Sequence, residues 1–166
     1  MERQADLEDV QSYVDIKRAA AGLYRDLGMS FEVDEERAAR DWSEHVQRSS
    51  AWVWEEDGRV AAYLVLRRLS ESMHIDQVTV HPDFAGRRIG AKLIEVANDQ
   101  ALLLGEKQLS LTTFETVPWN APYYVRLGFT TVPGQQLSPE MSRILDEESK
   151  NSPAGWKRVV MTRRAG

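Results

Sequence analysis

A short turn rich in glycine and arginine is the first feature of this sequence that suggests chemistry. Gly86 and Gly90 enclose Arg87 and Arg88, and the turn lies between a strand that ends at Val80 and an apolar helix. The first turn of a helix leaves up to four backbone N–H groups unpaired and carries about half a positive charge. Because glycine lets the backbone approach an anion closely, this pattern predicts a phosphate-binding turn.

Two common nucleotide-binding motifs are absent from this turn. A nucleoside triphosphate loop needs Gly-x-x-x-x-Gly-Lys-Ser/Thr, but Gly86 and Gly90 are too close together for it, and Lys92 is not followed by a hydroxyl residue. The dinucleotide motif Gly-x-Gly-x-x-Gly is missing as well. Taken alone, the turn therefore also fits an ordinary helix start with solvated arginines.

The surroundings of the turn resemble the cofactor turn of the GNAT superfamily of N-acetyltransferases. In that family, Gln/Arg-x-x-Gly-x-Gly/Ala follows a strand that ends in Val-x-Val. The strand end Val78–Val80 and the final Gly90 match this pattern. Ala85 replaces the polar first residue, and Arg88 replaces the first glycine.

A second motif further along the chain resembles the same family. Tyr124, Leu127, Gly128 and Phe129 form the Tyr-x-x-Leu-Gly-Phe pattern that follows the next strand. The two motifs occur in the family's order, with a helix and a strand between them. The resemblance covers the chain from the N-terminal helices to Val132.

The resemblance implies a fold and a cofactor. The expected fold class is mixed α/β, with one GNAT-like domain over residues 1–166. Its central, mostly antiparallel twisted sheet would have about six to seven strands, splayed at the cofactor site, and about four to five flanking helices. The expected cofactor is acetyl-CoA, with the strand end pairing to the pantetheine arm and the turn amides holding the pyrophosphate. The cofactor-binding residues would be Val78, Thr79, Val80, Ala85, Gly86, Arg87, Arg88, Ile89, Gly90, Ala91, Asn120 and Tyr124.

Tyr124 is the leading catalytic candidate. The resemblance implies that its hydroxyl lies near the thioester sulfur and protonates the departing thiolate. The chemistry is suitable, because a tyrosine with a pKa of about 10 stays protonated at neutral pH while a thiol ionises near about 8.5. Asn120 is four residues earlier, and Asn-Ala-Pro is typical of a helix N-cap with proline in the first turn, which would place the cap beside the cofactor arm.

The acceptor side offers several candidates. An amine attacks only when neutral, so a general base or water must take a proton. Asp76 ranks first, followed by His74 on the same face of the strand and by Glu115 at the end of the next strand. The resemblance implies general bases at the first two positions. Trp119, in the loop before the catalytic tyrosine, and Phe31, between the first helices, would contact the acceptor.

The periods of the hydrophobic residues predict the elements that hold these groups. Helical spacing covers two N-terminal segments, and alternation marks a hairpin around Asp57-Gly58. The expected order is helix Glu8–Leu27, helix Asp34–Ser49, strands Ala51–Glu55 and Val60–Leu66, strand Met73–Val80, a helix ending at about Leu104, strand Gln108–Phe114, helix Asn120–Leu127, a strand-like Phe129–Val132, a helix beginning at Ser138-Pro139, and strand Trp156–Arg163.

Composition limits the other functions. The chain has 166 residues, no cysteine and a formal charge of −5. Without cysteine, a thioester intermediate on the enzyme and a cysteine-based zinc site are excluded, and no metal site is expected. The acidic balance disfavours nucleic acid, and no apolar run is long enough for a membrane span. We therefore expect a cytoplasmic acetyltransferase acting on an amine by direct transfer, with a homodimer left open. The alternative is a non-catalytic acyl-CoA-binding or regulatory module on the same fold.

Overall fold

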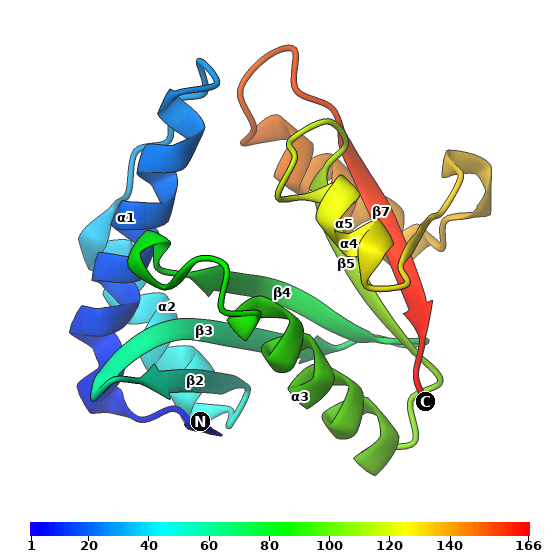
Figure 1. Cartoon of the computed structure of the whole chain (residues 1–166). Coiled ribbons are helices and arrows are strands. Elements are labelled where there is room, and N and C mark those ends of the chain that lie inside the picture. Colours follow the sequence, from blue (N-terminus) through cyan, green and yellow to red (C-terminus); the bar gives the residue numbers. More distant parts are fainter. The chain divides into compact units, whose positions relative to one another are not determined.

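A computed structural model describes the whole chain, residues 1–166, and the chain divides into two compact units (Figure 1). Unit 1 comprises residues 1–67 and 76–96, and unit 2 comprises residues 68–75 and 97–166. The expectation of one domain over the full chain stays a prediction.

Unit 1 contains the N-terminal strand, two helices and a hairpin. The elements are β1 (Glu2–Gln4), a 3-10 helix (Leu7–Asp9), α1 (Val10–Arg25), α2 (Glu35–Gln47), β2 (Ala51–Glu56) and β3 (Arg59–Arg68). The predicted Asp34 N-cap is confirmed, since its carboxylate accepts from the Arg37 amide at 3.0 Å. The predicted hairpin is also confirmed: Asp57 and Gly58 have φ of 52° and 72°, as a two-residue turn between right-twisted strands requires.

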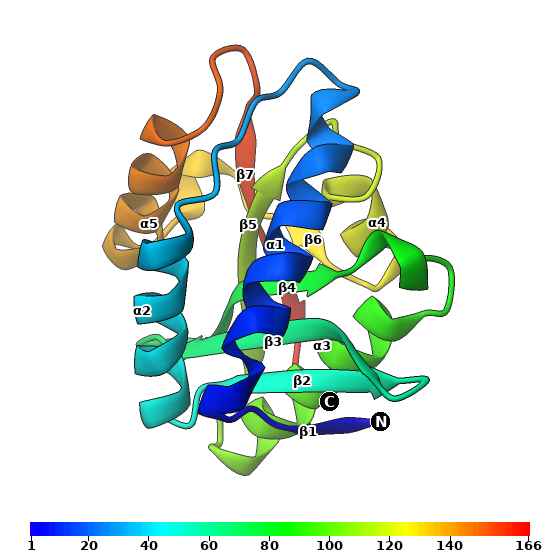
Figure 2. The ribbon, with the colours of Figure 1, turned by 90° about the vertical axis from the view of Figure 1, so that its left-hand side faces the viewer.

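The core of unit 1 is aromatic. Figure 2 shows α1 and α2 lying across one face of β2 and β3. Between the helices and the sheet, the Tyr13 ring stacks on Trp42 with centroids 4.6 Å apart and meets Tyr63 edge-on at the same distance. All three side chains are almost fully buried. This packing fixes the register of α1 against the sheet.

Two elements pass from one unit to the other. Strand β4 (Met73–Val80) begins in unit 2 and ends in unit 1, and α3 (Ile89–Leu103) begins in unit 1 and ends in unit 2. A 3-10 turn (Pro82–Phe84) follows β4. The predicted strand bounds are confirmed at both ends. The predicted end of the helix is also confirmed, because Gly105 adopts a left-handed φ of 74° just after it.

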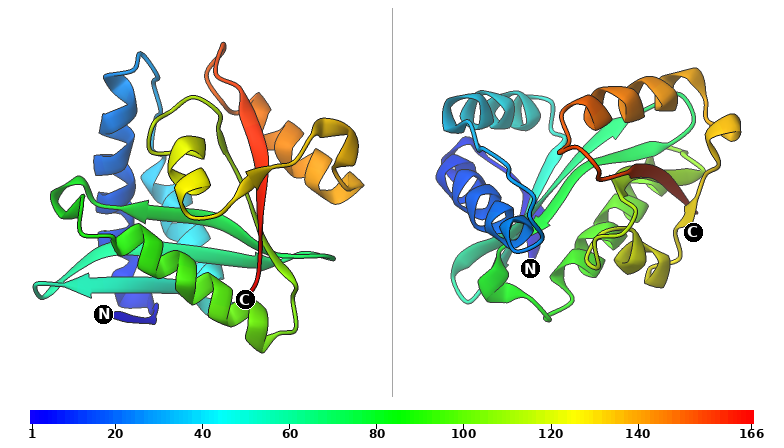
Figure 3. Two further views of the ribbon diagram at one scale, coloured as in Figure 1. Left: turned by 45° about the vertical axis from the view of Figure 1, so that its right-hand side comes forward. Right: turned by 90° about the horizontal axis from the view of Figure 1, so that it is seen from above.

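Unit 2 is built on a long antiparallel strand pair. Its elements are β5 (Gln108–Phe114), α4 (Ala121–Arg126), β6 (Thr130–Thr131), a 3-10 helix (Gly134–Gln136), α5 (Pro139–Lys150) and β7 (Arg158–Arg164). Helix α5 begins with proline in its first turn as predicted, and the Ser138 hydroxyl caps it by accepting from the Met141 amide at 3.2 Å. The helix lies beside β7 (Figure 3), and Met141, Ile144 and Val160 belong to one buried cluster between them.

The strands form one mixed sheet in the order β1-β2-β3-β4-β5-β7-β6. Strands β4 and β5 are parallel, with Met73 opposite Leu109 and His74 opposite Ser110. The registers of β1 with β2, β2 with β3, β5 with β7 and β6 with β7 are antiparallel. The expected mixed α/β fold with a mostly antiparallel sheet is therefore confirmed. No helix of the protein combines the length and hydropathy needed to cross a bilayer.

Two local predictions differ from the structure. Strand β1 was not expected, because its Glu-Arg-Gln sequence has neither alternation nor β-branched residues, and it forms only by pairing with β2. Asn120 precedes α4 as predicted but does not cap it with its side chain. Instead, its Oδ1 accepts a hydrogen bond from the Thr113 hydroxyl at 2.6 Å.

Candidate active site

The predicted phosphate turn, residues 85–91, has an unusual backbone. Gly86 has a φ of 78°, and Arg88 has a φ of 62°. For a residue with a Cβ, the left-handed region costs about 1 kcal/mol or more. Arg88 stands where the family pattern has its first glycine, and it adopts a left-handed conformation that glycine would adopt without this cost.

The amides of this turn are available to a ligand. Ala85 donates to the Pro82 carbonyl at 3.0 Å, and the next backbone bond runs from Lys92 to Arg88 at 3.1 Å. The N–H groups of residues 86–91 between them donate no hydrogen bond within the protein. A Cβ built on Gly86 would meet nothing within 4 Å, so the surface beside it is open. Open amides at the start of a 15-residue helix suit a pyrophosphate.

Three cations surround the turn in different ways. The Arg87 guanidinium is bound to Asp57 at 2.6 Å. Arg88 is exposed and forms no hydrogen bond or ion pair within the protein. Lys92, in the first turns of α3, lies over the Trp54 ring with its Nζ 4.7 Å from the centroid. The residues therefore fit an anionic ligand, with Arg88 as the exposed cation that has no partner within the protein.

The strand before the turn carries the predicted pantetheine-pairing residues. Val78, Thr79 and Val80 are each half-buried in unit 1. The strand is anchored at its end, where His81 donates its amide to the Ala61 carbonyl at 2.8 Å. Ile89, at the start of α3, is only 1% exposed and fixes the helix start to the core.

Asp76 lies at the point where β4 enters unit 1. Its carboxylate accepts a hydrogen bond from the Arg67 guanidinium at 2.9 Å, and its side chain is 21% exposed. Burial raises the pKa of Asp76 above its ordinary value, and the charges of Arg67 and His45 only partly oppose this shift. A carboxylate that holds its proton more strongly is a better proton acceptor.

The neighbouring Gln77 forms the centre of a partly buried polar cluster. Its Oε1 accepts from Lys17 Nζ at 2.9 Å and from the hydroxyls of Tyr13 and Tyr63 at 3.2 Å each. Burial lowers the pKa of Lys17 and raises that of Tyr13 to about 12. This cluster joins α1 to β3 and β4.

His74 has a different environment, in unit 2. It is 1% exposed, and its Nδ1 is 2.9 Å from the Ser110 hydroxyl. That hydroxyl is also 2.7 Å from the hydroxyl of Ser72, so the imidazole belongs to a buried chain of polar groups. His74 and Asp76 were expected on one face of the strand, but they belong to different units. Asp76 is the more exposed of the two candidate bases.

Tyr124 lies in α4 of unit 2. Its ring meets Tyr123 and Phe129 edge-on, with centroids 5.5 and 5.8 Å apart. The helix ends in a turn at Gly128, whose φ is 89°. The Tyr-x-x-Leu-Gly-Phe motif therefore forms one compact turn in which the buried Phe129 supports the tyrosine ring.

The remaining predicted residues lie at the surface or partly buried. In unit 2, Glu115 forms an exposed ion pair with Lys157 at 3.3 Å, and Trp119 is 38% exposed. In unit 1, Phe31 is half-buried and packs edge-on against Tyr24 with centroids 5.1 Å apart. These three side chains remain candidates for acceptor contacts.

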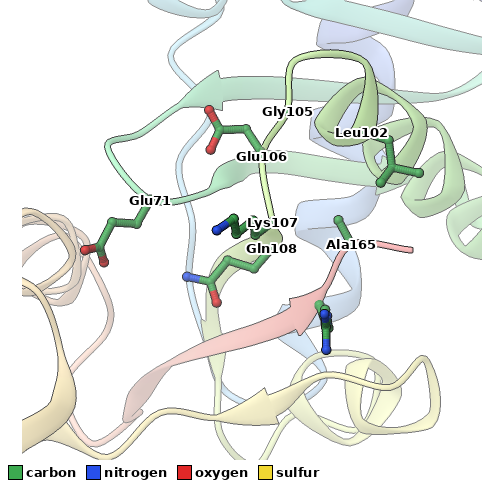
Figure 4. Close-up of a pocket in the computed structure, with 8 residues that line it drawn as sticks. Glu71, Leu102, Gly105, Glu106, Lys107, Gln108 and Ala165 are labelled. Atoms are coloured by element: carbon green, nitrogen blue, oxygen red, sulfur yellow. The ribbon is translucent and has the colours of Figure 1, made fainter.

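Two hollows lie outside the predicted residues. One, of about 820 Å³, is in unit 2 at the end of α3, where Figure 4 shows Glu71, Glu106 and Lys107 around its rim. Another, of about 650 Å³, lies in unit 1 and is lined by residues of α1, the hairpin turn and His81. Neither hollow is lined by any of the catalytic or cofactor residues predicted from the sequence.

A comparison with known protein families identifies the family of the chain. Residues 13–129 match the model of the acetyltransferase (GNAT) family, and the chain belongs to that family. Its acetyl donor is therefore acetyl-CoA, and the protein is an acetyltransferase.

Solved structures share the fold at low sequence identity. The PaiA N-acetyltransferase from Thermoplasma acidophilum, solved with coenzyme A, has a TM-score of 0.72 at 14% identity, covering 99% of this chain and 98% of that one. A GNAT-family acetyltransferase from Staphylococcus aureus has a TM-score of 0.74 at 11% identity, covering 100% and 99%. The N-acetylglutamate synthase from Neisseria gonorrhoeae, solved with coenzyme A and N-acetyl-glutamate, has a TM-score of 0.74 at 18% identity. The match covers all of this chain but only 35% of the synthase.

Gln77, Lys17 and the two acidic residues at the hairpin tip, Glu56 and Asp57, were not predicted from the sequence to belong to a site. A signal for the first two existed, because Tyr13 and Lys17 are four residues apart on the helix face that carries the apolar stripe. A lysine on such a face must find a buried acceptor. No comparable signal marked Asp57, which looked like an ordinary turn residue.

Proposed function

We propose that this acetyltransferase acts on an amine by direct transfer from acetyl-CoA in a ternary complex. The observation that carries the proposal is the family match over residues 13–129, which includes both the open turn 85–91 and Tyr124. The exposed turn amides and the unpaired guanidinium of Arg88 support binding of the donor's pyrophosphate.

The proton transfers are assigned to two residues. The thioester supplies an activated acetyl group. The amine nitrogen forms a bond to the acetyl carbon, and the carbon–sulfur bond breaks. Asp76 receives the proton that the amine loses, directly or through water, and its raised pKa supports this role. Tyr124 donates its hydroxyl proton to the departing thiolate, and solvent restores both groups.

Each of the other candidates has a narrower role in the proposal. The strand end Val78–Val80 pairs with the pantetheine arm. Asn120 links the start of α4 to β5 through its hydrogen bond with Thr113. His74 and Glu115 are secondary bases. Phe31 and Trp119 contact the acceptor.

The test measures thiol release from acetyl-CoA with a panel of amines: a polyamine, an aminoglycoside, amino acids and a peptide N-terminus. For the best acceptor, Tyr124→Phe should lower kcat by about 100-fold, the usual contribution of a general acid. Tyr123→Phe is the matched control and should retain kcat within about twofold. The proposal fails if no amine is acetylated and Tyr124→Phe behaves like the wild type.

A non-catalytic acyl-CoA-binding module is the second candidate. Ala85 and Arg88 favour it, because both depart from the family's turn pattern. Calorimetry with acetyl-CoA separates the two candidates. Binding without turnover of any amine in the panel would favour the module, and binding with turnover would favour the enzyme.

A further inference from the structure

The tip of the β2–β3 hairpin contacts the 3-10 turn 82–84 and the cofactor turn 85–91 that follows it, through one ion pair to each. Asp57 of the hairpin binds Arg87 of the turn at 2.6 Å, and Arg59 of the hairpin approaches Asp83 at 3.8 Å. Glu56 adds a second carboxylate, 3.8 Å from the Arg87 guanidinium. Each segment thus supplies both an acid and a base to the other.

Both arginines contact the same aromatic ring. The guanidinium carbons of Arg59 and Arg87 are each 5.1 Å from the centroid of Phe84, which is 4% exposed. The ring belongs to the 3-10 turn that leads into the cofactor turn. Both guanidinium groups therefore contact the buried ring of Phe84 while carboxylates bind their N–H groups.

The turn has few interactions of its own that could hold it. Two of its residues, Gly86 and Arg88, have left-handed φ values, and the N–H groups of residues 86–91 form no hydrogen bond within the protein. Such a backbone has many accessible conformations unless side chains fix it. The contacts of Arg87 with the hairpin are the ion pairs that the turn makes.

The hairpin is well suited to be the fixed partner. Its strands are paired from Ala51–Val65 to Glu56–Arg59, and its two turn residues, Asp57 and Gly58, have the φ values of a tight hairpin turn. The Asp57 carboxylate therefore has a defined position from which to hold Arg87. With Arg87 bound there, Arg88 remains the arginine of the turn without a partner.

We infer that Glu56, Asp57 and Arg59 are positioning residues for acetyl-CoA, holding the turn 85–91 in the conformation that binds the pyrophosphate. This inference rests on the proposed role of the turn. It adds a segment of the chain, the hairpin tip, that neither sequence motif includes.

The experiment compares Asp57→Asn and Asp83→Asn with the wild type. Asparagine tolerates the left-handed backbone of residue 57, so the substitution removes the charge and leaves the turn geometry. Glu44→Gln is the matched control, because it removes one negative charge from another exposed carboxylate–arginine pair of unit 1, with Arg48 at 3.9 Å. Calorimetry with coenzyme A is carried out at about 50 mM and about 500 mM NaCl, since the higher salt screens exposed pairs.

Asp57→Asn should bind coenzyme A about threefold more weakly at low salt, in keeping with the modest strength of exposed ion pairs. Asp83→Asn should have a smaller effect of the same sign, and Glu44→Gln should match the wild type. At high salt, the ratio of the coenzyme A dissociation constants of Asp57→Asn and the wild type should approach one. In turnover, the KM for acetyl-CoA should rise while kcat and the acceptor KM stay unchanged, which a general loss of structure would not produce.

Unchanged or tighter binding by Asp57→Asn would overturn the inference; tighter binding would mean that the released Arg87 itself binds phosphate. Should Asp57→Asn unfold, Arg59→Gln gives the same test, because it removes the second pair from within the paired strand. A wild-type protein that does not bind coenzyme A would instead overturn the proposed function. The two failures are thus distinguishable.

Discussion

Two neighbouring segments of unit 1 place polar groups in opposite environments. The turn 85–91 has open amides, an exposed Arg88 and left-handed residues. A few residues earlier, the amide oxygen of Gln77 accepts from three donors in a partly buried cluster, and the neighbouring Asp76 is bound to Arg67. The turn offers unsatisfied groups to a ligand, whereas the cluster satisfies its groups within the protein.

This difference separates binding from proton transfer. The turn depends on backbone dipoles, so its side chains can vary, as Arg88 in a glycine position illustrates. The cluster depends on burial, which raises the pKa of Asp76 and lowers that of Lys17, because in both cases it disfavours the charged form. Substitutions in the cluster should therefore have larger effects than substitutions in the turn.

The largest effect is expected for Gln77→Leu. The substitution leaves Lys17 and two tyrosine hydroxyls without their shared acceptor, so the free energy of unfolding should fall by about 3 kcal/mol. Urea denaturation measures it. Gln47→Leu, at an exposed position of α2, is the control and should change stability by less than about 0.5 kcal/mol. Equal free energies of unfolding for the two variants would show that the hydrogen bonds of Gln77 add no more stability than an exposed glutamine does.

Asp76→Asn should lower kcat/KM for the acceptor by about 100-fold, because it removes the proposed proton acceptor. In the wild type, activity should rise with pH through a pKa above the ordinary value of 3.8, and the variant should lack that limb. The exposed Asp99→Asn is the control. A variant that keeps the wild-type pH profile would assign the proton to water or to another residue.

The same raised pKa has a stability consequence with a defined sign. The folded state holds the Asp76 proton more strongly than the unfolded state, so the stabilisation is fully present below pH 3.8 and is lost as pH rises through the folded pKa. Comparing urea midpoints of the wild type and Asp76→Asn across this range isolates the contribution.

Gly86→Ala should destabilise the protein by about 1 kcal/mol, because alanine is strained at a φ of 78°. Steric overlap contributes nothing, since no atom lies within 4 Å of the new Cβ. Gly134→Ala has equally open surroundings but no left-handed φ, so it should be nearly neutral. Thermal unfolding of both variants gives the comparison, and identical melting temperatures would contradict it.

The smallest effect is expected for Arg88→Gly. Relief of the left-handed strain should raise the free energy of unfolding by about 0.5 kcal/mol, since part of the gain is offset by the greater entropy of the unfolded glycine chain. Affinity for coenzyme A should fall about threefold with the loss of one exposed cation. Arg88→Asn loses the charge but tolerates the backbone, so similar affinities of both variants would assign the loss to charge alone.

Much of the fold could be predicted from the sequence because its signals are local. The bounds of β4 and β5 were predicted to the residue, since alternation and the His81-Pro82 break are both visible in the chain. Helix ends were predicted within a few residues from caps and glycines. Strand β1 was missed because three polar residues become a strand only by pairing with Trp52 to Trp54, far along the chain.

The site divides in the same way. The position of the turn between β4 and α3 was predicted from the glycines and the strand end, whereas its role in binding stays a prediction. The cluster around Gln77 was not predicted, because it depends on how α1 lies against β3 and β4. The predicted side-chain cap at Asn120 was wrong for a related reason: Thr113, seven residues earlier on β5, offers its side chain a stronger buried partner than the helix amides do.

The order of strands in unit 2 also bears on how the protein is made. Strand β7 lies between β5 and β6 in the sheet, and it is the last strand of the chain. During synthesis, β5 therefore cannot pair with its antiparallel neighbour until residues 158–164 have left the ribosome. The β2–β3 hairpin, in contrast, can form as soon as it emerges. Ribosome-bound chains truncated before β7 would thus present the edge of β5 without its antiparallel neighbour, so we expect them to aggregate more readily than the full chain.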